Sequence, residues 1–124
     1  MPAAPHILIV DDHREIRDLV SRALTKDGFR VSTAADGRAM RKALADSRID
    51  LILLDLMLPG EDGLSLCRAV RADSNTPIIM LTAKGQREDR ETALECGADV
   101  FMTKPFANAD FVAAVERLSS GRPA

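Results

Sequence analysis

Short apolar runs alternate with helix-spaced apolar positions along the whole chain, and this alternation restricts the fold more than any other feature of the sequence. It is typical of repeated strand-helix units whose strands form a parallel sheet. Five runs are expected to be strands: 7–10, 30–34, 51–54, 78–81 and 100–103. The sequence therefore predicts an α/β fold with five parallel strands and a helix after each of them, five helices in total.

The patterning of the runs predicts where each strand lies in the sheet. Residues 51–54 and 78–81 are unbroken apolar runs, as expected for central strands that helices cover on both faces. Residues 30–34 alternate instead, with Val31 and Thr33 between polar or small residues. We therefore expect this second strand at an edge of the sheet.

Helix-spaced apolar residues between the runs predict the buried helix faces. In the first helix, five residues are expected to share the buried face: Ile16, Leu19, Val20, Ala23 and Leu24. Gly28 and Gly97 follow the first and fourth helices, where a glycine in the left-handed conformation commonly ends a helix. The fourth helix, about 86–96, is mostly charged, so we expect it to move most easily.

Length and composition exclude several classes of protein. With 124 residues, 46% of them hydrophobic, we expect one domain over 1–124, with a core at 6–118 and a flexible tail at 119–124. A formal net charge of -2 without a basic stripe argues against direct nucleic-acid binding. The apolar runs are far shorter than the roughly 18 residues of a membrane span, so we expect a soluble, cytoplasmic protein.

Polar residues directly follow four of the five predicted strands. They are Asp11 and Asp12 after the first, Asp55 after the third, Thr82 after the fourth and Lys104 after the fifth. The carboxyl ends of parallel strands meet at one edge of a sheet, where such folds bind ligands. Taken singly, each residue could instead cap a helix, start a turn or be solvated.

Folding alone would not favour placing these aspartates together at one edge of the sheet. Two unit charges about 4 Å apart repel by about 4 kcal/mol at an effective dielectric near 20, and three carboxylates would meet at this edge. A hard divalent cation would neutralise the excess, and Mg2+ fits because it prefers carboxylates, waters and phosphate oxygens. A carboxylate beside Mg2+, a lysine and a hydroxyl is the set of groups that phosphoryl transfer to an aspartate requires.

Five short motifs occur in order along the chain: Val-Asp-Asp at 10–12, Leu-Asp-Leu-Met-Leu-Pro-Gly at 54–60, Leu-Thr-Ala at 81–83, Gly-Ala-Asp at 97–99 and Thr-Lys-Pro-Phe at 103–106. With them, residues 7–118 resemble the CheY-like receiver domain of two-component response regulators. The resemblance implies a doubly wound, flavodoxin-like sheet of strand order 2-1-3-4-5. It also implies a phosphoryl group taken from a sensor histidine kinase or phosphotransfer protein, and control of an output domain or partner protein.

The resemblance further implies which residues form the phosphorylation site. Asp55 would be the phosphoacceptor and also one of the metal ligands, and Asp12 would bind Mg2+ directly. Asp11 would act through a metal-bound water, and Met57 would offer its backbone carbonyl to the metal. The protein would catalyse its own phosphorylation and autodephosphorylation and would not be a classical enzyme.

Three more residues are implied to read out the phosphoryl group. The Thr82 hydroxyl would donate to it and the Lys104 ammonium would pair with it. Phe101 matches the family's switch aromatic, which turns inward as the threonine moves toward the phosphate. Phosphorylation would then bias an existing two-state equilibrium.

The sequence around Asp55 and Lys104 resembles that of the transcription-factor branch of the family. Receivers of that branch dimerise through the fourth helix, fifth strand and fifth helix. Val100, Thr92 and Ala114 replace charged residues that usually complete the ion pairs of that dimer. A homodimer through this face would therefore be weak and would rest on hydrophobic contacts.

Three other functions fit the sequence less well. A flavodoxin-like cofactor module would need a hydroxyl-rich loop after the first strand and aromatic residues for the flavin, and the chain has no Trp or Tyr. A metal-dependent phosphatase with an aspartyl nucleophile would need an acid where Met57 stands. A degenerate receiver used only for protein contacts would not retain the acidic pair, acceptor, threonine and lysine.

The cysteines and histidines are expected to carry no chemistry of their own. Cys67 and Cys96 lack the spacing of a metal knuckle or a redox pair, and we expect both to be reduced packing residues. His6 and His13 match no phosphorylation site of the family, and we expect both to be structural or solvated.

Overall fold

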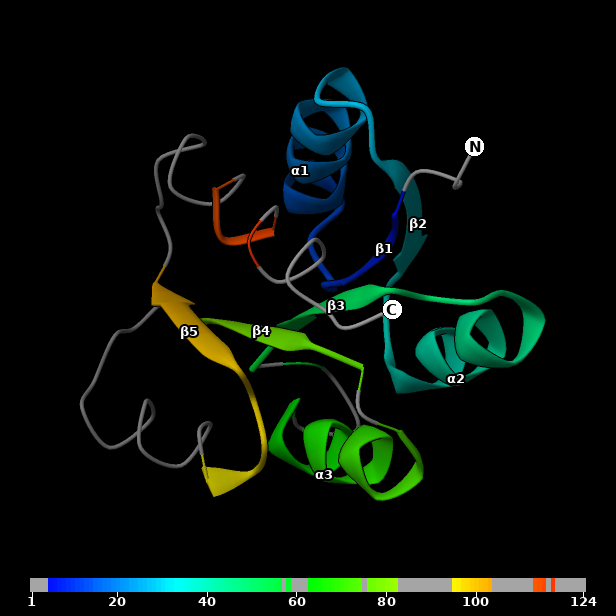
Figure 1. Cartoon of the computed structure of the whole chain (residues 1–124), viewed down its shortest axis with the longest axis vertical. Helices are drawn as coiled ribbons and strands as arrows, with labels where there is room; N and C mark the ends of the chain where they lie inside the picture. Colours follow the sequence, from blue (N-terminus) through cyan, green and yellow to red (C-terminus); the bar gives the residue numbers. More distant parts are fainter. Residues whose placement is uncertain are drawn as a thin grey trace.

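A parallel β-sheet of five strands runs through the middle of the molecule (Figure 1). The computed structural model describes residues 5–56, 58, 63–74, 76–82, 95–103, 113–115 and 117. The strands are β1 (His6–Val10), β2 (Arg30–Ala34), β3 (Leu51–Asp55), β4 (Ile78–Thr82) and β5 (Val100–Thr103), and they lie in the order β2-β1-β3-β4-β5. Both the predicted strands and the predicted strand order are confirmed.

Three helices are described in full: α1 (Arg14–Lys26), α2 (Gly37–Asp46) and α3 (Gly63–Asp73). The fourth and fifth predicted helices fall mostly outside the described residues. Helical conformation is present at Glu95, at residues 113–115 and at Arg117.

The helices form a layer on each face of the sheet (Figure 1). On one face, Val20 and Leu24 of α1 and Val115 pack against strand residues such as Ile7 and Ile9. On the other face, α2 and α3 contribute Met40, Leu66, Cys67 and Val70, which pack against strand residues such as Leu8 and Val10. Alternate residues of one strand thus pack against the helices on opposite faces of the sheet, as the pleat of a β-strand requires.

The alternating second strand lies at the edge of the sheet, as predicted. β2 pairs only with β1, and all of its side chains except that of Ala34 are partly or fully exposed. The unbroken strand β3 is fully buried along its length. Edge and centre positions therefore follow the hydrophobic pattern of each strand.

One prediction for α1 is wrong. Leu19, expected on the buried face, is 53% exposed, whereas Val20 and Leu24 are buried. Val20 and Leu24 are four residues apart and lie one above the other on the helix. Leu19 lies about 100° around the helix from Val20, which places it at the margin of the apolar stripe.

Both glycines predicted to end helices adopt the left-handed conformation. Gly28 has a φ of 95° and Gly97 a φ of 105°. At Gly97 the turn is held by Arg71 of α3, whose guanidinium donates to the Gly97 carbonyl oxygen at 2.6 Å and 3.1 Å. The same guanidinium lies 3.1 Å from the carboxylate of Asp99, which accepts the Ile78 backbone N–H at 2.9 Å.

Both cysteines are buried and reduced, as predicted. The Cys67 thiol on α3 donates to the Cys96 carbonyl oxygen at 3.5 Å. Burial, together with a smaller contribution from the neighbouring Cys96, raises the pKa of the Cys67 thiol to about 11. Cys67 is therefore a packing residue whose thiol stays protonated at neutral pH.

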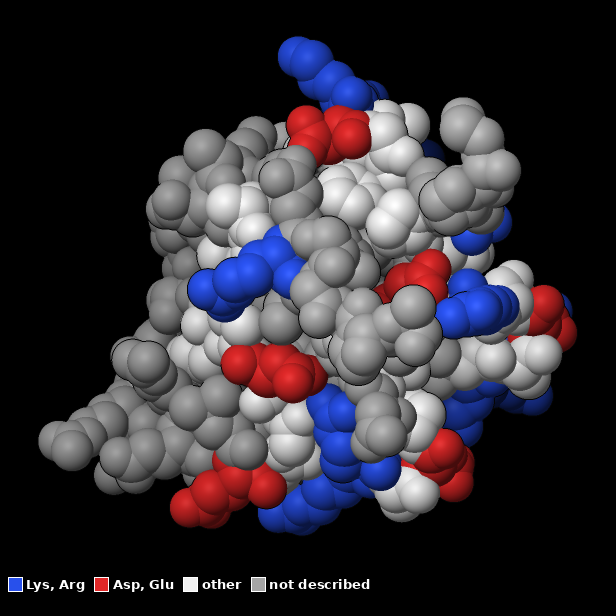
Figure 2. All heavy atoms as spheres, viewed as in Figure 1, with Lys and Arg blue, Asp and Glu red and all other residues white. Residues whose placement is uncertain are grey.

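Positive and negative side chains are interspersed on the face shown in Figure 2, where no large area of a single sign is formed by the coloured residues. This distribution agrees with the small net charge of the chain. None of the helices in the described ranges combines the length and apolar character that crossing a bilayer would demand.

Candidate functional site

The strand register brings the aspartates after β1 and β3 to the same edge of the sheet. β1 and β3 are hydrogen-bonded neighbours, and Val10 pairs with Leu54. The next residue on each strand is an aspartate, Asp11 after Val10 and Asp55 after Leu54. Because the strands are parallel, the two carboxylates lie level with each other at the carboxyl end of the sheet.

The backbone around Asp11 is fixed from three sides. Its N–H donates to the Ala34 carbonyl oxygen at 3.0 Å, which continues the β1–β2 ladder by one residue. Its carbonyl oxygen accepts from the Arg17 guanidinium at 2.8 Å. Its carboxylate accepts the His13 N–H at 2.8 Å, just before α1 begins. Asp11 does not cap α1, whose N-cap residue is His13, and its carboxylate stays buried at the sheet edge.

Gly63 lets α3 begin directly against the strand that carries Asp55. A Cβ at Gly63 would collide with the backbone carbonyl oxygen of Asp55 and with the Cα of Leu56, which it would approach to 2.8 Å. The Gly63 N–H donates to the Leu56 carbonyl oxygen at 2.9 Å. Only a residue without a side chain fits this close approach of two backbones.

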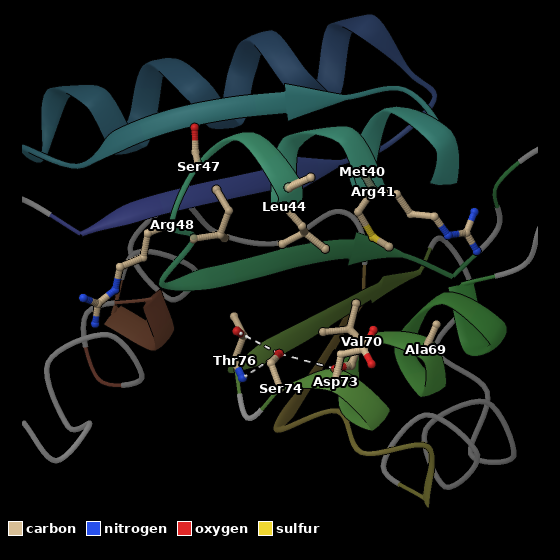
Figure 3. Close-up of a pocket in the computed structure, with 12 residues that line it drawn as sticks. Met40, Arg41, Leu44, Ser47, Arg48, Ala69, Val70, Asp73, Ser74 and Thr76 are labelled. Carbon is tan, nitrogen blue, oxygen red and sulfur yellow. Dashed lines mark hydrogen bonds between the residues drawn. The ribbon is translucent and has the colours of Figure 1, made fainter.

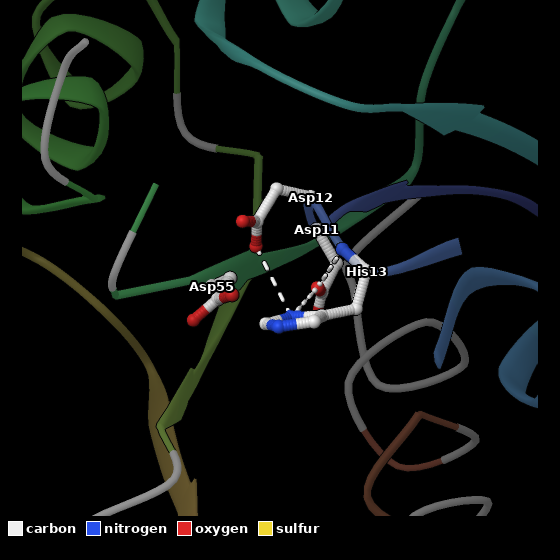
Figure 4. A group of neighbouring side chains, drawn as sticks. All are labelled: Asp11, Asp12, His13 and Asp55. Atoms are coloured by element: carbon white, nitrogen blue, oxygen red, sulfur yellow. Dashed lines mark hydrogen bonds and ion pairs between the residues drawn. The ribbon is translucent and has the colours of Figure 1, made fainter. Parts of the chain in front are cut away.

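Four side chains converge at the edge of the sheet (Figure 4). Asp11, Asp12 and His13 come from the β1–α1 junction and Asp55 from the end of β3, and each offers a ligand atom within 4.8 Å of the others. Asp11 is 0% exposed and Asp55 3%, whereas the side chain of Asp12 is 33% exposed. Carboxylates placed this close together repel one another, and a bound cation would offset that repulsion.

The donor chemistry fits a divalent metal ion. Three carboxylates supply hard oxygen ligands of the kind that Mg2+ prefers, and the partly exposed Asp12 leaves one side open to water. Asp11, Asp12 and Asp55, which the sequence predicted as one site, are thus brought together.

The remaining predicted site residues are described only in part. Thr82 ends β4, one residue beyond the Asp55–Leu81 pair, so its backbone lies at the same edge of the sheet. Phe101 of β5 pairs with Met80 and is partly buried against the α2–α3 layer. Met57 and Lys104 lie outside the described residues, and so does the side chain of Thr82.

His13 belongs to the cluster, although the sequence suggested only a structural or solvated role. Its Nδ1 atom lies 3.2 Å from a carboxylate oxygen of Asp11 and 3.2 Å from one of Asp12. The available signal was its position directly after the acidic pair. His6, by contrast, is structural as expected, because its Nε2 atom hydrogen-bonds the Ser32 hydroxyl at 2.6 Å.

A pocket lies between α2 and α3 and is separate from this site (Figure 3). It has a volume of about 540 Å3, with Met40, Leu44 and Val70 on its apolar walls and Arg48 and Asp73 among its polar lining. None of the four cluster residues lines it. The chemistry predicted from the sequence therefore belongs to the strand ends and not to this pocket.

Comparisons with known proteins agree with this architecture. Residues 7–116 match the model of the response regulator receiver domain family. Protein PetR of Rhodobacter capsulatus is 47% identical over 102 residues, which is 82% of this chain and 43% of PetR. The chain thus matches less than half the length of that curated relative.

Solved receiver structures superpose over nearly the whole chain. Chemotaxis protein CheY4 of Vibrio cholerae is 34% identical, with a TM-score of 0.88, and the alignment covers 94% of this chain and 99% of CheY4. The DrrB receiver domain, solved in a BeF3-activated form, is 31% identical, with a TM-score of 0.87 over 96% of this chain and 99% of DrrB. A doubly wound sheet of this order, with an acidic cluster at its carboxyl edge, is the architecture of a phosphorylatable signalling module.

The chain belongs to the response regulator receiver domain family of two-component signalling. Membership implies phosphorylation on an aspartate, interaction with histidine kinases and effectors, and use of a divalent metal ion. The acidic cluster is the place in this chain where such an ion fits.

Proposed function

We propose that this domain accepts a phosphoryl group on Asp55 from the phosphohistidine of a sensor histidine kinase or phosphotransfer protein, in a Mg2+-dependent reaction. The observation that carries the proposal is the placement of Asp55. Its carboxylate is buried at the end of β3, within 4.8 Å of ligand atoms of Asp11, Asp12 and His13. No other aspartate that the structure describes ends a strand inside such a cluster.

Asp55 acts as the nucleophile. One carboxylate oxygen attacks phosphorus in line, an O–P bond forms, and the P–N bond to the donor imidazole breaks. The electron pair of that bond leaves with the imidazole nitrogen, which takes up a proton. The buried backbone around Asp55, held on one side by the close approach of Gly63, keeps the carboxylate aimed at the strand edge.

The other residues of the site are proposed to bind the metal ion that balances the charge of the phosphoryl group. Bound Mg2+ would balance charge on the equatorial oxygens of the moving group. Asp12 and Asp55 are proposed to bind this ion through their carboxylates, Asp11 through a water, and Met57 through its backbone carbonyl. The burial of Asp11 and the partial exposure of Asp12 support this division, because the exposed carboxylate is the one that a hydrated ion reaches first.

The proposed switch runs through the last two strands. Thr82 would donate its hydroxyl to the phosphoryl group and Lys104 would pair with it. Phe101, which is partly buried against the core in this structure, would then change its position. A coupling of roughly 1 to 3 kcal/mol between phosphorylation and the active conformation is enough for control of this kind.

We further propose that residues 6–118 are one receiver unit which acts in the cytoplasm and controls an output domain or partner protein. The match to only 43% of PetR supports an effector region in relatives of this kind. Where a homodimer forms through the face that includes β5, it is expected to be weak.

Phosphorylation by a small phosphodonor tests the assignment of Asp55. Acetyl phosphate with Mg2+ should add about 80 Da to the wild-type chain, through a bond that is stable to acid and cleaved by hydroxylamine. The Asp55→Asn variant should lose this mass completely, as measured by intact-protein mass spectrometry.

Asp50→Asn is the matched control, since Asp50 immediately precedes β3 whereas Asp55 ends it. Its carboxylate accepts the His6 N–H at 2.8 Å and lies 3.7 Å from Arg48, far from the acidic cluster in the fold. Equal labelling of both variants would refute the assignment, and equal loss in both would point to a folding defect.

A further inference from the structure

An imidazole lies among the carboxylates of the proposed metal site. His13 Nδ1 is 3.2 Å from an oxygen of Asp11 and 3.2 Å from an oxygen of Asp12, and both contacts are visible in Figure 4. Its backbone is held by the hydrogen bond from its N–H to Asp11 and by its position directly before α1. The imidazole nitrogen therefore lies within the cluster, beside two of its carboxylates.

The separations match those between ligands of one metal ion. Zn2+ binds nitrogen and oxygen at about 2.0 to 2.2 Å, so two ligands of a tetrahedral ion lie about 3.4 Å apart. The 3.2 Å separation of Nδ1 from the Asp12 oxygen is close to this value, and Asp55 offers a ligand atom within 4.8 Å of the others. The side chain of His13 is 67% exposed, so small rotations that improve the geometry meet little steric resistance.

The nitrogen changes which ion the site prefers. Mg2+ favours oxygen ligands and gains little from an imidazole, whereas Zn2+ and Cu2+ bind imidazole strongly. We propose that His13 Nδ1, with the carboxylates of Asp12 and Asp55, binds borderline transition-metal ions such as Zn2+ and Cu2+ in competition with Mg2+. This inference rests on the proposed function only in placing a divalent ion at the cluster.

A consequence for signalling follows from the shared ligand. An ion held by His13 as well as by Asp55 would displace the Mg2+ that the labelling reaction needs. Zn2+ should therefore suppress Mg2+-dependent labelling of Asp55. This would make the receiver sensitive to the metal supply as well as to its kinase.

Metal affinities of the untagged chain test the inference. Isothermal titration calorimetry, with Zn2+ and with Mg2+ in separate experiments, gives the ratio of Zn2+ affinity to Mg2+ affinity. We expect this ratio to fall at least tenfold in His13→Ala. Loss of a residue that only supports a metal ligand already lowers metal affinity 10- to 100-fold. His6→Ala is the control, because His6 bonds Ser32 and is absent from the cluster. A ratio that is unchanged in His13→Ala, or that falls equally in His6→Ala, would overturn the proposal.

A spectroscopic measurement identifies the ligand directly. The chain has two histidines, so His13 is the only imidazole in His6→Ala. Pulsed electron paramagnetic resonance of Cu2+ bound to this variant should show the modulation of an imidazole nitrogen, and the double variant His6→Ala/His13→Ala should not. Absence of the modulation in His6→Ala would also overturn the proposal.

The two hypotheses can fail separately. Labelling of Asp55 in wild-type protein with Mg2+ tests the phosphoacceptor, and the Zn2+ measurements test His13 without any phosphodonor. Normal labelling with no role of His13 in Zn2+ binding would refute only the metal inference. Zn2+ binding through His13 without labelling of Asp55 would refute only the proposed phosphorylation.

Discussion

Aspartates flank the strands at both ends of the sheet, and they are used in opposite ways. At the amino end, Asp50 precedes β3 and accepts the first N–H of β1 from His6 at 2.8 Å. Asp99 precedes β5 and accepts the first N–H of β4 from Ile78 at 2.9 Å. Each of these carboxylates also lies near an arginine, and the pair of Asp99 with Arg71 is the closer, at 3.1 Å.

At the carboxyl end, the aspartates are placed against one another. Asp11, Asp12 and Asp55 lie together with His13, and two of the three are buried. The amino end satisfies strand N–H groups and stabilises the fold, whereas the carboxyl end concentrates negative charge where a cation and a phosphoryl group would bind. The burial of an aspartate therefore does not reveal its role, but the sign of the charges around it does.

The largest effect is expected from Gly63→Ala at the carboxyl end. The new methyl group would meet the backbone at Asp55 and Leu56, which cannot move without disturbing β3, so we expect a loss of about 3 kcal/mol in the free energy of unfolding. Urea denaturation followed by circular dichroism measures this loss.

Gly28→Ala provides the matched control for that substitution. Gly28 has a positive φ but no atom within 4 Å of an added Cβ, so only the conformational strain of about 1 to 2 kcal/mol is expected. If both variants lose the same stability, the close approach of α3 to β3 is not the cause.

Asp99→Ala should show the structural role of the aspartates at the amino end. The change leaves the buried Ile78 N–H without its acceptor and Arg71 without its carboxylate, which should cost about 2 kcal/mol of stability. Asp46→Ala, at the exposed end of α2, should stay within about 0.5 kcal/mol of wild type. A loss in Asp99→Ala no larger than that of the control would remove the contrast between the two ends.

At the carboxyl end, Asp12→Asn should change stability in the opposite direction to Asp99→Ala. In buffer without divalent metal and at low salt, relief of repulsion from Asp11 and Asp55 should raise stability by between zero and about 1 kcal/mol, because Asp12 is partly solvated. The same variant should bind Mg2+ more weakly by titration calorimetry. Clear destabilisation, or unchanged Mg2+ affinity, would count against a functional cluster.

The smallest effect concerns Cys67 and depends on pH. Burial raises the pKa of its thiol to about 11, so the folded chain keeps a proton that the unfolded chain releases near the ordinary thiol pKa of about 8.5. Stability should therefore fall as the pH rises from about 9 to 11. The fall should be shallower in Cys67→Ala, as urea midpoints at a series of pH values would show, and equal slopes in both proteins would refute this contribution.

The sequence predicted the backbone well because local pattern and burial agree in this fold. Each apolar run became a strand whose limits differ from the prediction by no more than one residue at either end, and the alternating run became the edge strand. The acidic site was predictable because parallel strands bring their carboxyl ends together. Leu19 was placed wrongly because the width of a buried helix stripe depends on the layer beneath it, which a periodic pattern does not contain.

By itself, the sequence determined the class of fold, the edge strand, the turn glycines and the aspartates that share one edge of the sheet. These features depend on periodicity and on residue type, which are local properties of the chain. Only the tertiary structure showed that Arg71 of α3 holds the turn before β5, and that His13 reaches both neighbouring carboxylates. Those contacts depend on where a side chain ends in space, which is fixed only when the helices pack on the sheet.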